Sequence, residues 1–271
     1  MAEPVVGPTT DDAVRGPEHE LLLRAALWVG ADAVDAWRMW SAITTVDTLD
    51  PDSQWLLPLL FHNLQAQGVP SHLLVRYRHV YRHNWYKNQL RLRRAEAVID
   101  SIEREQGASL ILGGAAMALR CHDAIGVRPF ESVQVLVRSG VCPHPDPTTD
   151  GAFAIDVRRW VFGGEHDEAA MARATEESWR GRRWRVLDSV DQLLDICLRR
   201  HEWDRRSKLF WIADAVTLVR HQRAIDWTVV DERATQIGLR EHVASALRSI
   251  TPLCAGAVLP HEWSSAGRLA S

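Results

Sequence analysis

Two adjacent glycines, Gly113 and Gly114, follow the short apolar run of residues 109–112 and precede a segment with helical character. A strand that ends in Gly-Gly and leads into a helix can present its backbone N–H groups to a phosphate. The same glycines can serve only to let the helix approach the strand closely. On these residues alone the packing role is favoured, and a ligand site needs further polar residues beside them.

Such residues stand at alternate positions in two other short segments. Ser132 and Gln134 interrupt the apolar run "SVQVLV", and Asp156 and Arg158 stand in "GAFAIDVRRWVF". Alternate residues of a β-strand point to the same side of a sheet, so each pair is expected on one face. Convergent Arg and Gln side chains would indicate binding of a polar small molecule.

The elements that must position these residues are short strands between long helical segments. Residues 107–188 contain the strands, including one expected at 183–187. Before them, apolar residues recur at helical spacing in residues 19–40, 50–70 and 71–106. Helical patterns return from Ser189, an expected helix cap, onward. One side of the 71–106 helix is expected to be buried through its apolar and aromatic residues Leu73, Tyr77, Val80, Tyr81 and Trp85.

This order predicts an α+β fold, in which a small mixed sheet is flanked by N-terminal and C-terminal helical regions. The expected divisions of the chain are a disordered leader, an N-terminal helical region, a β-containing core and a C-terminal helical region, at residues 1–18, 19–106, 107–188 and 189–271.

Composition excludes several classes of protein. The chain has 271 residues, 25% charged, with a formal net charge of -3, so a general polyanion-binding character is not indicated. Its four cysteines form no C-x-x-C pair, which argues against structural zinc and a disulfide framework. Cys142, His144 and Asp146 lie in a Pro-rich loop and are not taken as a metal site. With no apolar run near ~20 residues and no signal peptide, a cytoplasmic protein is predicted.

Several motifs in order carry a resemblance to a known family. They read "LILGGAAMAL", "RPFESVQVLV", "IDVRRW", "LLDICL", "LFWIAD" and "DW". Together they resemble the bacterial uncharacterised nucleotidyltransferases, over about residues 20–260. The resemblance implies a nucleotidyltransferase-like core, with strand residues that hold Mg²⁺ for nucleotidyl transfer. It also implies a ligand site at Gly113, Gly114, Arg128, Ser132, Gln134 and Arg158.

The chain departs from the family pattern at the residues that should do the chemistry. Ser132 and Gln134 stand where the family has two aspartates, and Gly113 stands where it has lysine; of three expected acids only Asp156 remains. Mg²⁺ prefers hard anionic oxygens, and a hydroxyl and a carboxamide are neutral. Catalysis through two metal ions is therefore expected to be lost or greatly weakened. Asp156 is the remnant catalytic position, and no metal site is predicted.

The leading hypothesis is a degenerate member of the family that binds a small molecule or nucleotide in the remnant cleft. A repurposed role in bacterial specialised metabolism is the setting that the resemblance implies. No cofactor is expected, and Mg²⁺ would be needed only if nucleotidyl transfer survives. One alternative is a non-catalytic module that docks an acidic protein partner through Arg76, Arg78 and Arg82 of the basic helix 76–94. A second is an active nucleotidyltransferase with relocated carboxylates. Nucleic acid and membrane are not expected as partners.

Overall fold

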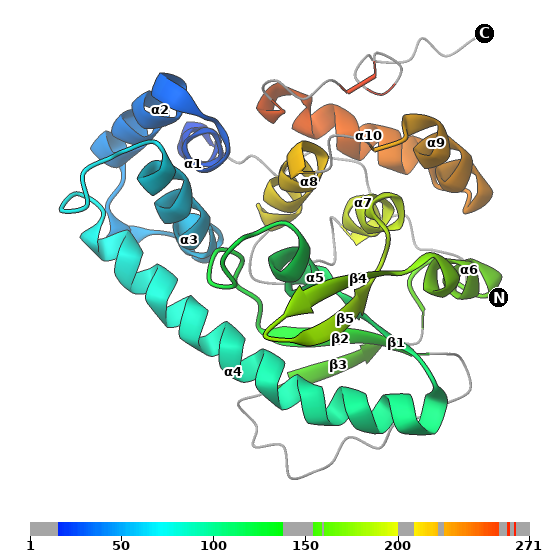
Figure 1. The fold of residues 1–271 in the computed structure, drawn as a ribbon. Coiled ribbons are helices and arrows are strands. Elements are labelled where there is room, and N and C mark those ends of the chain that lie inside the picture. Colours follow the sequence, from blue (N-terminus) through cyan, green and yellow to red (C-terminus); the bar gives the residue numbers. More distant parts are fainter. Residues whose placement is uncertain are drawn as a thin grey trace, which may run out of the picture.

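The computed structural model describes residues 16–137, 154–158, 160–199, 209–221, 225–254, 259–260 and 263. Within them, helices from the two ends of the chain lie together above a small sheet, and one long helix runs beneath it (Figure 1). The architecture is α+β, as predicted. None of the described helices has the length and apolar character needed to span a bilayer.

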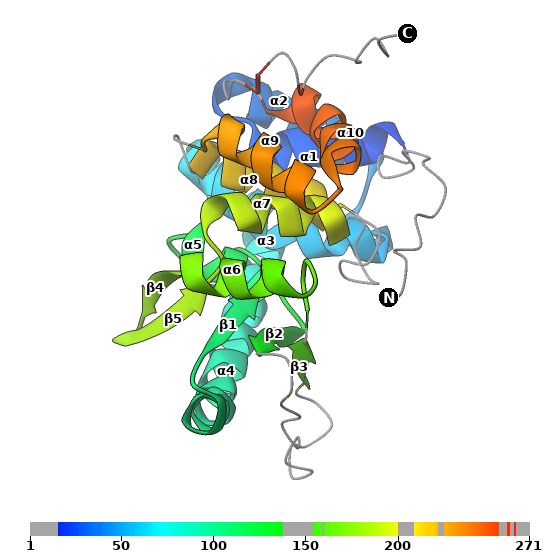
Figure 2. The same ribbon diagram turned by 90° about the vertical axis from the view of Figure 1, so that its right-hand side faces the viewer.

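The helices of the two ends share one hydrophobic core. Its buried side chains include Leu23, Trp40 and Leu60 from the first part of the chain and Leu193 and Val216 from the last part. Regions far apart in sequence therefore form a single helical body (Figures 1 and 2). The N-terminal helices are α1 (Pro17–Leu27), α2 (Gly30–Ile43), α3 (Pro51–Ala66) and α4 (Val75–Gln106), and the C-terminal helices are α7 (Ser189–Leu198), α8 (Phe210–His221), α9 (Trp227–Gln236) and α10 (Arg240–Ile250).

The sheet has five strands in the order β3-β2-β1-β5-β4. Strands β1 and β2 are antiparallel, as are β4 and β5, whereas β3 pairs parallel to β2 and β5 pairs parallel to β1. The sheet is therefore mixed, as predicted, with β3 at one edge. The strands are β1 (Ser109–Leu112), β2 (Ser132–Val137), β3 (Ala154–Arg158), β4 (Thr175–Trp179) and β5 (Arg182–Val186).

Alternation along the strands divides the sheet into two different faces. On one face, apolar residues such as Ile111 and Val135 pack against Ala95 of α4 and Ala116 of α5 (Gly113–Arg120). On the other face, a smaller cluster joins Leu110, Leu112 and Leu136 to Ala170 and Met171 of α6 (Glu165–Arg173). The second face also carries the polar residues of β2 and β3.

The segment before β2 packs with its backbone directly against α4 at Gly126. A Cβ atom on Gly126 would lie 2.6 Å from the Cβ atom of Trp85 and 3.0 Å from its Cα atom, so only glycine fits there. Tyr77 is buried, as predicted, but Leu73 and Trp85 are 51% and 42% exposed, so those two predictions are wrong. Leu73 lies in the turn before α4, which begins at Val75. Helical spacing placed Trp85 on the buried side of α4, but the neighbouring elements cover it only in part.

The expected helix at residues 19–40 is two helices, α1 and α2. The Asn63 side-chain amide donates to the carbonyls of Ala25 and Trp28, at 2.7 and 2.8 Å, and satisfies the end of α1. Gly30 begins α2 with φ +71°, and its N–H donates to Gln67. Because α3 supplies these caps from more than 30 residues away, local periodicity does not reveal the break.

Other local features of the second half differ from expectation. Asp188, not Ser189, caps α7, and its carboxylate accepts the Asp191 N–H at 2.8 Å. The strand expected at residues 183–187 is β5, but α6 and β4 had no expected counterpart. The strand β4, "TEESW", has mostly polar residues because it is an edge strand, so the apolar pattern of a core strand is absent.

Candidate functional site

The polar residues of β2 and β3 lie side by side on the second face of the sheet. In the parallel ladder, Gln134 is opposite Asp156 and Ser132 is opposite Ala154. Adjacent strands are about 4.8 Å apart, so the side chains of Gln134 and Asp156 emerge as neighbours. Ser132, Gln134 and Asp156 are all partly exposed. The structure therefore brings together Ser132, Gln134 and Asp156, three of the residues predicted to form the site.

Asp156 is already engaged by the other polar residue of its strand. Arg158 Nε donates to Asp156 Oδ2 at 2.9 Å, and the two side chains are 38% and 39% exposed. An arginine thus stands on this carboxylate, where the resemblance implies a metal ion. The ion pair leaves the Asp156 carboxylate accessible but electrostatically compensated.

A second arginine reaches the same face from α7. Arg199, at the C-terminal end of α7, is 8% exposed, and its Nη1 lies 3.5 Å from Gln134 Oε1, at the long limit of a hydrogen bond. Its Nε lies 2.5 Å from Asp195 Oδ1, in an ion pair between residues one helical turn apart. Arg199 therefore joins α7 to the substituted position on β2.

Asp195 is the most deeply buried acid near this face. Its side chain is fully buried, and neither carboxylate oxygen has a partner with hydrogen-bond geometry in the described part of the chain. The close approach of Arg199 is thus an ion pair rather than a well-aligned hydrogen bond. Burial raises the pKa of Asp195 despite the opposing positive charges of Arg199 and Arg158. Arg158, Asp195 and Arg199 consequently belong to one electrostatic cluster.

The two glycines occupy the start of α5, next to Gln134 in the sheet. Leu112, the residue before Gly113, is opposite Gln134 in the antiparallel ladder. Gly113 has φ +63°, a conformation that other residues rarely adopt, so a lysine there would be strained. A Cβ atom on Gly114 would lie 3.0 Å from Phe130 Cβ and 3.1 Å from Arg128 Cζ. Both glycines thus have a packing role in addition to their predicted ligand role.

Arg128 is enclosed in the protein. Its Nε donates to Asp214 Oδ1 at 2.9 Å and its Nη2 to Asp214 Oδ2 at 2.9 Å, and both side chains are 2% exposed. Its Nη1 donates to the Pro129 carbonyl, and its Cζ atom lies 3.8 Å from the centre of the Phe210 ring. This pair connects the "RPFES" and "LFWIAD" motifs. The guanidinium is placed to hold them together, and ligand contact by Arg128 stays a prediction.

The three arginines predicted to bind a partner have different surroundings on α4. Arg76 is exposed and pairs with Asp47 at 2.8 Å. Arg78 is partly buried, and its Nε is buried without a hydrogen-bond partner among the described residues. Arg82 is exposed. They lie away from Gln134 and Asp156, so the partner surface and the ligand site are separate.

The side chains on the sheet face do not fit a pair of Mg²⁺ ions. Ser132 and Gln134 offer a hydroxyl and a carboxamide, and the Asp156 carboxylate is held by Arg158. No group of three or more His, Cys, Asp or Glu residues suited to a metal ion occurs in the described ranges. The residues Cys142, His144 and Asp146 lie outside those ranges. The chemistry available at this face is therefore hydrogen bonding and charge pairing.

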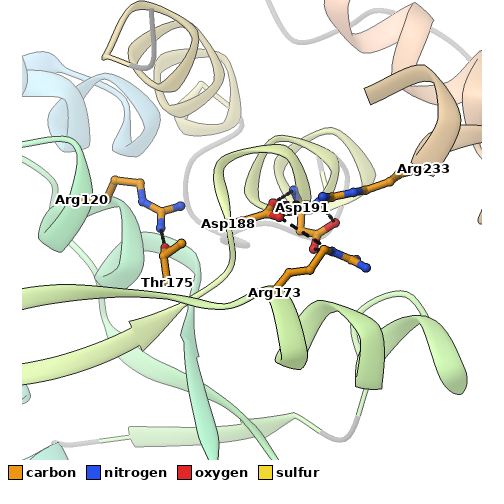
Figure 3. A network of polar contacts seen from close by, with 6 residues as sticks. All are labelled: Arg120, Arg173, Thr175, Asp188, Asp191 and Arg233. Carbon is orange, nitrogen blue, oxygen red and sulfur yellow. Dashed lines mark hydrogen bonds and ion pairs between the residues drawn. The ribbon is translucent and has the colours of Figure 1, made fainter. Parts of the chain in front are cut away.

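A small pocket occurs elsewhere, between α6, α7 and α9, and contains none of the predicted ligand residues. Arg233 donates to Asp188 at 2.7 Å and to Asp191 at 2.9 Å, and Arg173 donates to Asp191 at 2.9 Å (Figure 3). Two acids and two arginines compensate each other there. The network ties α6 and α9 to the start of α7 and is explained by packing alone.

Arg120 fixes α5 in a similar way at the opposite edge of the sheet. Its Nε donates to Glu177 at 2.9 Å. Its Nη2 donates to the Thr175 hydroxyl (Figure 3). Because both partners lie on β4, the helix that starts at the glycine pair is anchored at its far end. The position of Gly113 and Gly114 beside β2 is thereby fixed.

Sequence reasoning missed Arg199 and Asp195. The motif "LLDICL" places a charged residue, Asp195, within an otherwise apolar helical turn, and Arg199 follows four residues later. A charge on the buried side of an amphipathic helix, with an opposite charge one turn away, was the available signal. The direction of α7 relative to the sheet was needed to connect that pair to Gln134.

Comparison with known proteins agrees with the resemblance. A family model described as uncharacterised nucleotidyltransferase matches residues 148–253, which run from before β3 to the end of the helical segment after α10. The match starts after β2, so it does not include the strand in which the resemblance implies acids at the positions of Ser132 and Gln134. No curated protein matches the chain. Residues 148–253 thus match the uncharacterised nucleotidyltransferase family, and the α+β fold is consistent with a nucleotidyltransferase-like domain.

Proposed function

We propose that this protein is a degenerate nucleotidyltransferase-fold protein that binds a small molecule or nucleotide at the remnant site, without metal-dependent nucleotidyl transfer. The observation that carries the proposal is the pairing of Asp156, the one remaining acid, with Arg158 beside Gln134. An arginine on the carboxylate competes with a cation for the same oxygens. The substitutions at Ser132 and Gln134 remove the other anionic ligands.

The role that we propose is recognition rather than nucleotidyl transfer. Ser132, Gln134 and Arg158 offer a hydroxyl, an amide and a guanidinium from two adjacent strands, which suits a polar ligand. The setting in bacterial specialised metabolism rests on the family resemblance alone. A cytoplasmic location is part of the same proposal, and the lack of a C-x-x-C pair among the four cysteines of the sequence supports it.

Thermal unfolding with candidate ligands tests this function. Nucleoside triphosphates and other polar metabolites are added to the full chain in EDTA and, separately, in Mg²⁺. A bound ligand should raise the unfolding temperature in both conditions. Replacement of Gln134 by Ala should abolish the rise without unfolding the free protein. Protection that persists fully in Gln134→Ala would place the ligand elsewhere and contradict the proposal.

The surviving-enzyme alternative makes the opposite prediction. An active nucleotidyltransferase should release pyrophosphate from a nucleoside triphosphate in the presence of Mg²⁺ and an acceptor, and Asp156→Asn should stop the release. We expect no release above the rate of a protein-free sample. Sustained, Asp156-dependent release would show that catalysis persists and would overturn the degenerate assignment.

A second candidate function is docking of an acidic protein partner on α4. The observation that favours it is the exposure of Arg82, Arg93 and Lys87 along a stretch, residues 75–94, that contains no acid. Charge reversal at Arg78 and Arg82 should then weaken partner binding, whereas Gln134→Ala should not. Equal effects of both changes would indicate general destabilisation rather than a docking surface.

A further inference from the structure

Three elements converge on the substituted positions of the sheet. Strand β2 supplies Gln134, strand β3 supplies Asp156 and Arg158, and α7 supplies Arg199. Arg199 approaches Gln134 from one side, and Arg158 holds Asp156, the neighbour of Gln134, on the other. Two guanidinium groups thus flank the place where the resemblance implies metal-binding carboxylates.

The charge at this place is less negative than the one that the resemblance implies. Three carboxylates would give a strongly negative site that attracts cations. Here Arg158 compensates Asp156, and Arg199 compensates Asp195 when Asp195 is ionised. Burial raises the pKa of Asp195, which favours its neutral form and leaves Arg199 with less compensation. Asp167, whose negative charge also acts on Asp195, accepts the backbone N–H groups of Val161, Phe162 and Gly163. Each carboxylate at this face thus has a compensating partner or a raised pKa, and an anion is repelled less than by three uncompensated carboxylates.

The cluster also retains hydrogen-bond donors for a ligand. Arg158 uses its Nε for Asp156, and its two Nη groups make no hydrogen bond within the described part of the chain. The oxygen of the Gln134 amide lies toward Arg199, so its NH₂ group is the remaining donor of that side chain. The Ser132 hydroxyl lies one alternate position along β2. Guanidinium groups form paired hydrogen bonds with phosphate oxygens, and several donors suit a tetrahedral oxyanion.

We infer that Arg158 and Arg199 bind the phosphate group of a ligand directly, in the place where the family pattern would use metal ions. This inference rests on the proposed function and specifies its ligand class: a phosphate-bearing molecule bound without a divalent cation. Arg158 contacts the phosphate with its Nη groups. Arg199 contributes its positive charge and Nη donors, and Asp195 positions it. Gln134 carries no charge. An aspartate at the same position would form an ion pair with Arg199 and leave that arginine unavailable to the ligand.

Calorimetric titration of the full chain with pyrophosphate in EDTA tests the inference. Binding should be measurable without metal, and Arg158→Gln should weaken it by about tenfold or more, the loss expected for a charged hydrogen bond. Arg183→Gln is the matched control because Arg183 lies on β5, is 79% exposed and removes the same charge from the same sheet. The control should change the affinity less than about twofold.

Arg199 requires a variant that separates binding from folding. Arg199→Gln alone leaves the buried Asp195 without its counter-charge, so the double variant Asp195→Asn/Arg199→Gln removes both charges together. Its thermal unfolding should stay cooperative, while pyrophosphate binding should fall about tenfold. A titration with citrate distinguishes carboxylate from phosphate recognition and should give much weaker heat.

The outcomes separate this inference from the function that it deepens. Pyrophosphate or ATP binding that is abolished by Gln134→Ala but is unchanged in the Arg158 and Arg199 variants would overturn the arginine site and keep the proposed function. Citrate binding as tight as pyrophosphate binding would overturn the phosphate class. No ligand protection from any compound, with or without Mg²⁺, would contradict the proposed function itself.

Discussion

Two arginine–aspartate pairs differ in burial: Arg128 and Asp214 join two motifs of the sequence, whereas Asp156 and Arg158 lie within one. Arg128 and Asp214 are each 2% exposed, and the three guanidinium nitrogens of Arg128 all donate to protein oxygens. Arg158 and Asp156 are 38% and 39% exposed, and only Nε of Arg158 is used for the pair. All three nitrogens of Arg128 are used within the protein, so this arginine holds the fold together. The two Nη groups of Arg158 are not used for its pair, so this arginine can bind a ligand.

Removal of the arginine alone from the buried Arg128–Asp214 pair should give the largest loss of stability. Arg128→Met leaves the Asp214 carboxylate in the interior without its main counter-charge, which should cost about 3–5 kcal/mol in the free energy of unfolding measured in urea. The double variant Arg128→Met/Asp214→Leu should recover much of the loss, because no buried charge remains. A loss no larger than that of Arg158→Gln would break the comparison between the two pairs.

Acid should lower the stability of the protein through His122, which is close enough to Arg128 for the positive charge of that arginine to act on it. Burial lowers the pKa of His122 to about 3, with His62, Arg128 and His221 adding to the effect. The unfolded chain, with a histidine pKa near 6.5, binds a proton that the folded protein does not between about pH 6.5 and 3. Stability from this group is therefore present above pH 6.5 and decreases as the pH falls, by about 1 kcal/mol for each pH unit.

Urea unfolding of the wild-type protein and His122→Gln at pH 6.5 and 4.5 measures this contribution. The fall in unfolding free energy between the two pH values should be about 2 kcal/mol smaller in the variant. Identical pH dependence in the two proteins would show that His122 is charged in the folded state or does not control acid stability.

The packing of Gly114 against the buried pair should give a smaller effect. In Gly114→Ala, the added methyl group meets Phe130 at 3.0 Å and the Arg128 guanidinium at 3.1 Å. Because Asp214 and Pro129 hold that guanidinium, we expect a loss of about 1 kcal/mol in unfolding free energy. An unchanged or higher stability would show that Arg128 can move and would weaken the description of this pair as rigid.

The partly exposed pair of Arg158 and Asp156 should contribute least to the free energy of unfolding. Arg158→Gln should lower the unfolding free energy by less than about 1 kcal/mol, as expected for an ion pair in contact with water. Urea denaturation of Arg158→Gln and Arg128→Met under the same conditions compares the two losses in unfolding free energy directly. A loss comparable to that of the buried pair would assign Arg158 to the fold instead of the ligand site.

The sequence predicted the α+β class, the first two strands at residues 109–112 and 132–137, and the shared face of Asp156 and Arg158. It placed the third strand within residues 151–162, and the structure shows it at Ala154–Arg158. These features depend on alternation and helical spacing, which are local. The break between α1 and α2 was not predictable because Asn63 and Gln67, from α3, create it. Strand β4 was missed because an edge strand tolerates polar residues.

For the candidate site, sequence order identified the substituted positions but not their partners. That Arg128 pairs with Asp214, 86 residues away, and that Arg199 reaches Gln134, 65 residues away, depends on how the C-terminal helices lie on the sheet. Both contacts are long-range pairings between side chains that are common in any soluble protein. Three-dimensional proximity is what distinguishes their roles.

The metal dependence of ATP binding tests the central claim most directly. The dissociation constant of the wild-type protein is measured in EDTA and in Mg²⁺, beside the variant Ser132→Asp/Gln134→Asp, which restores the family's acids. The account predicts that wild-type binding is as tight or tighter without Mg²⁺, and that the variant loses its metal-free binding. Wild-type binding that requires Mg²⁺ would contradict the claim that arginines have taken the place of the metal ions.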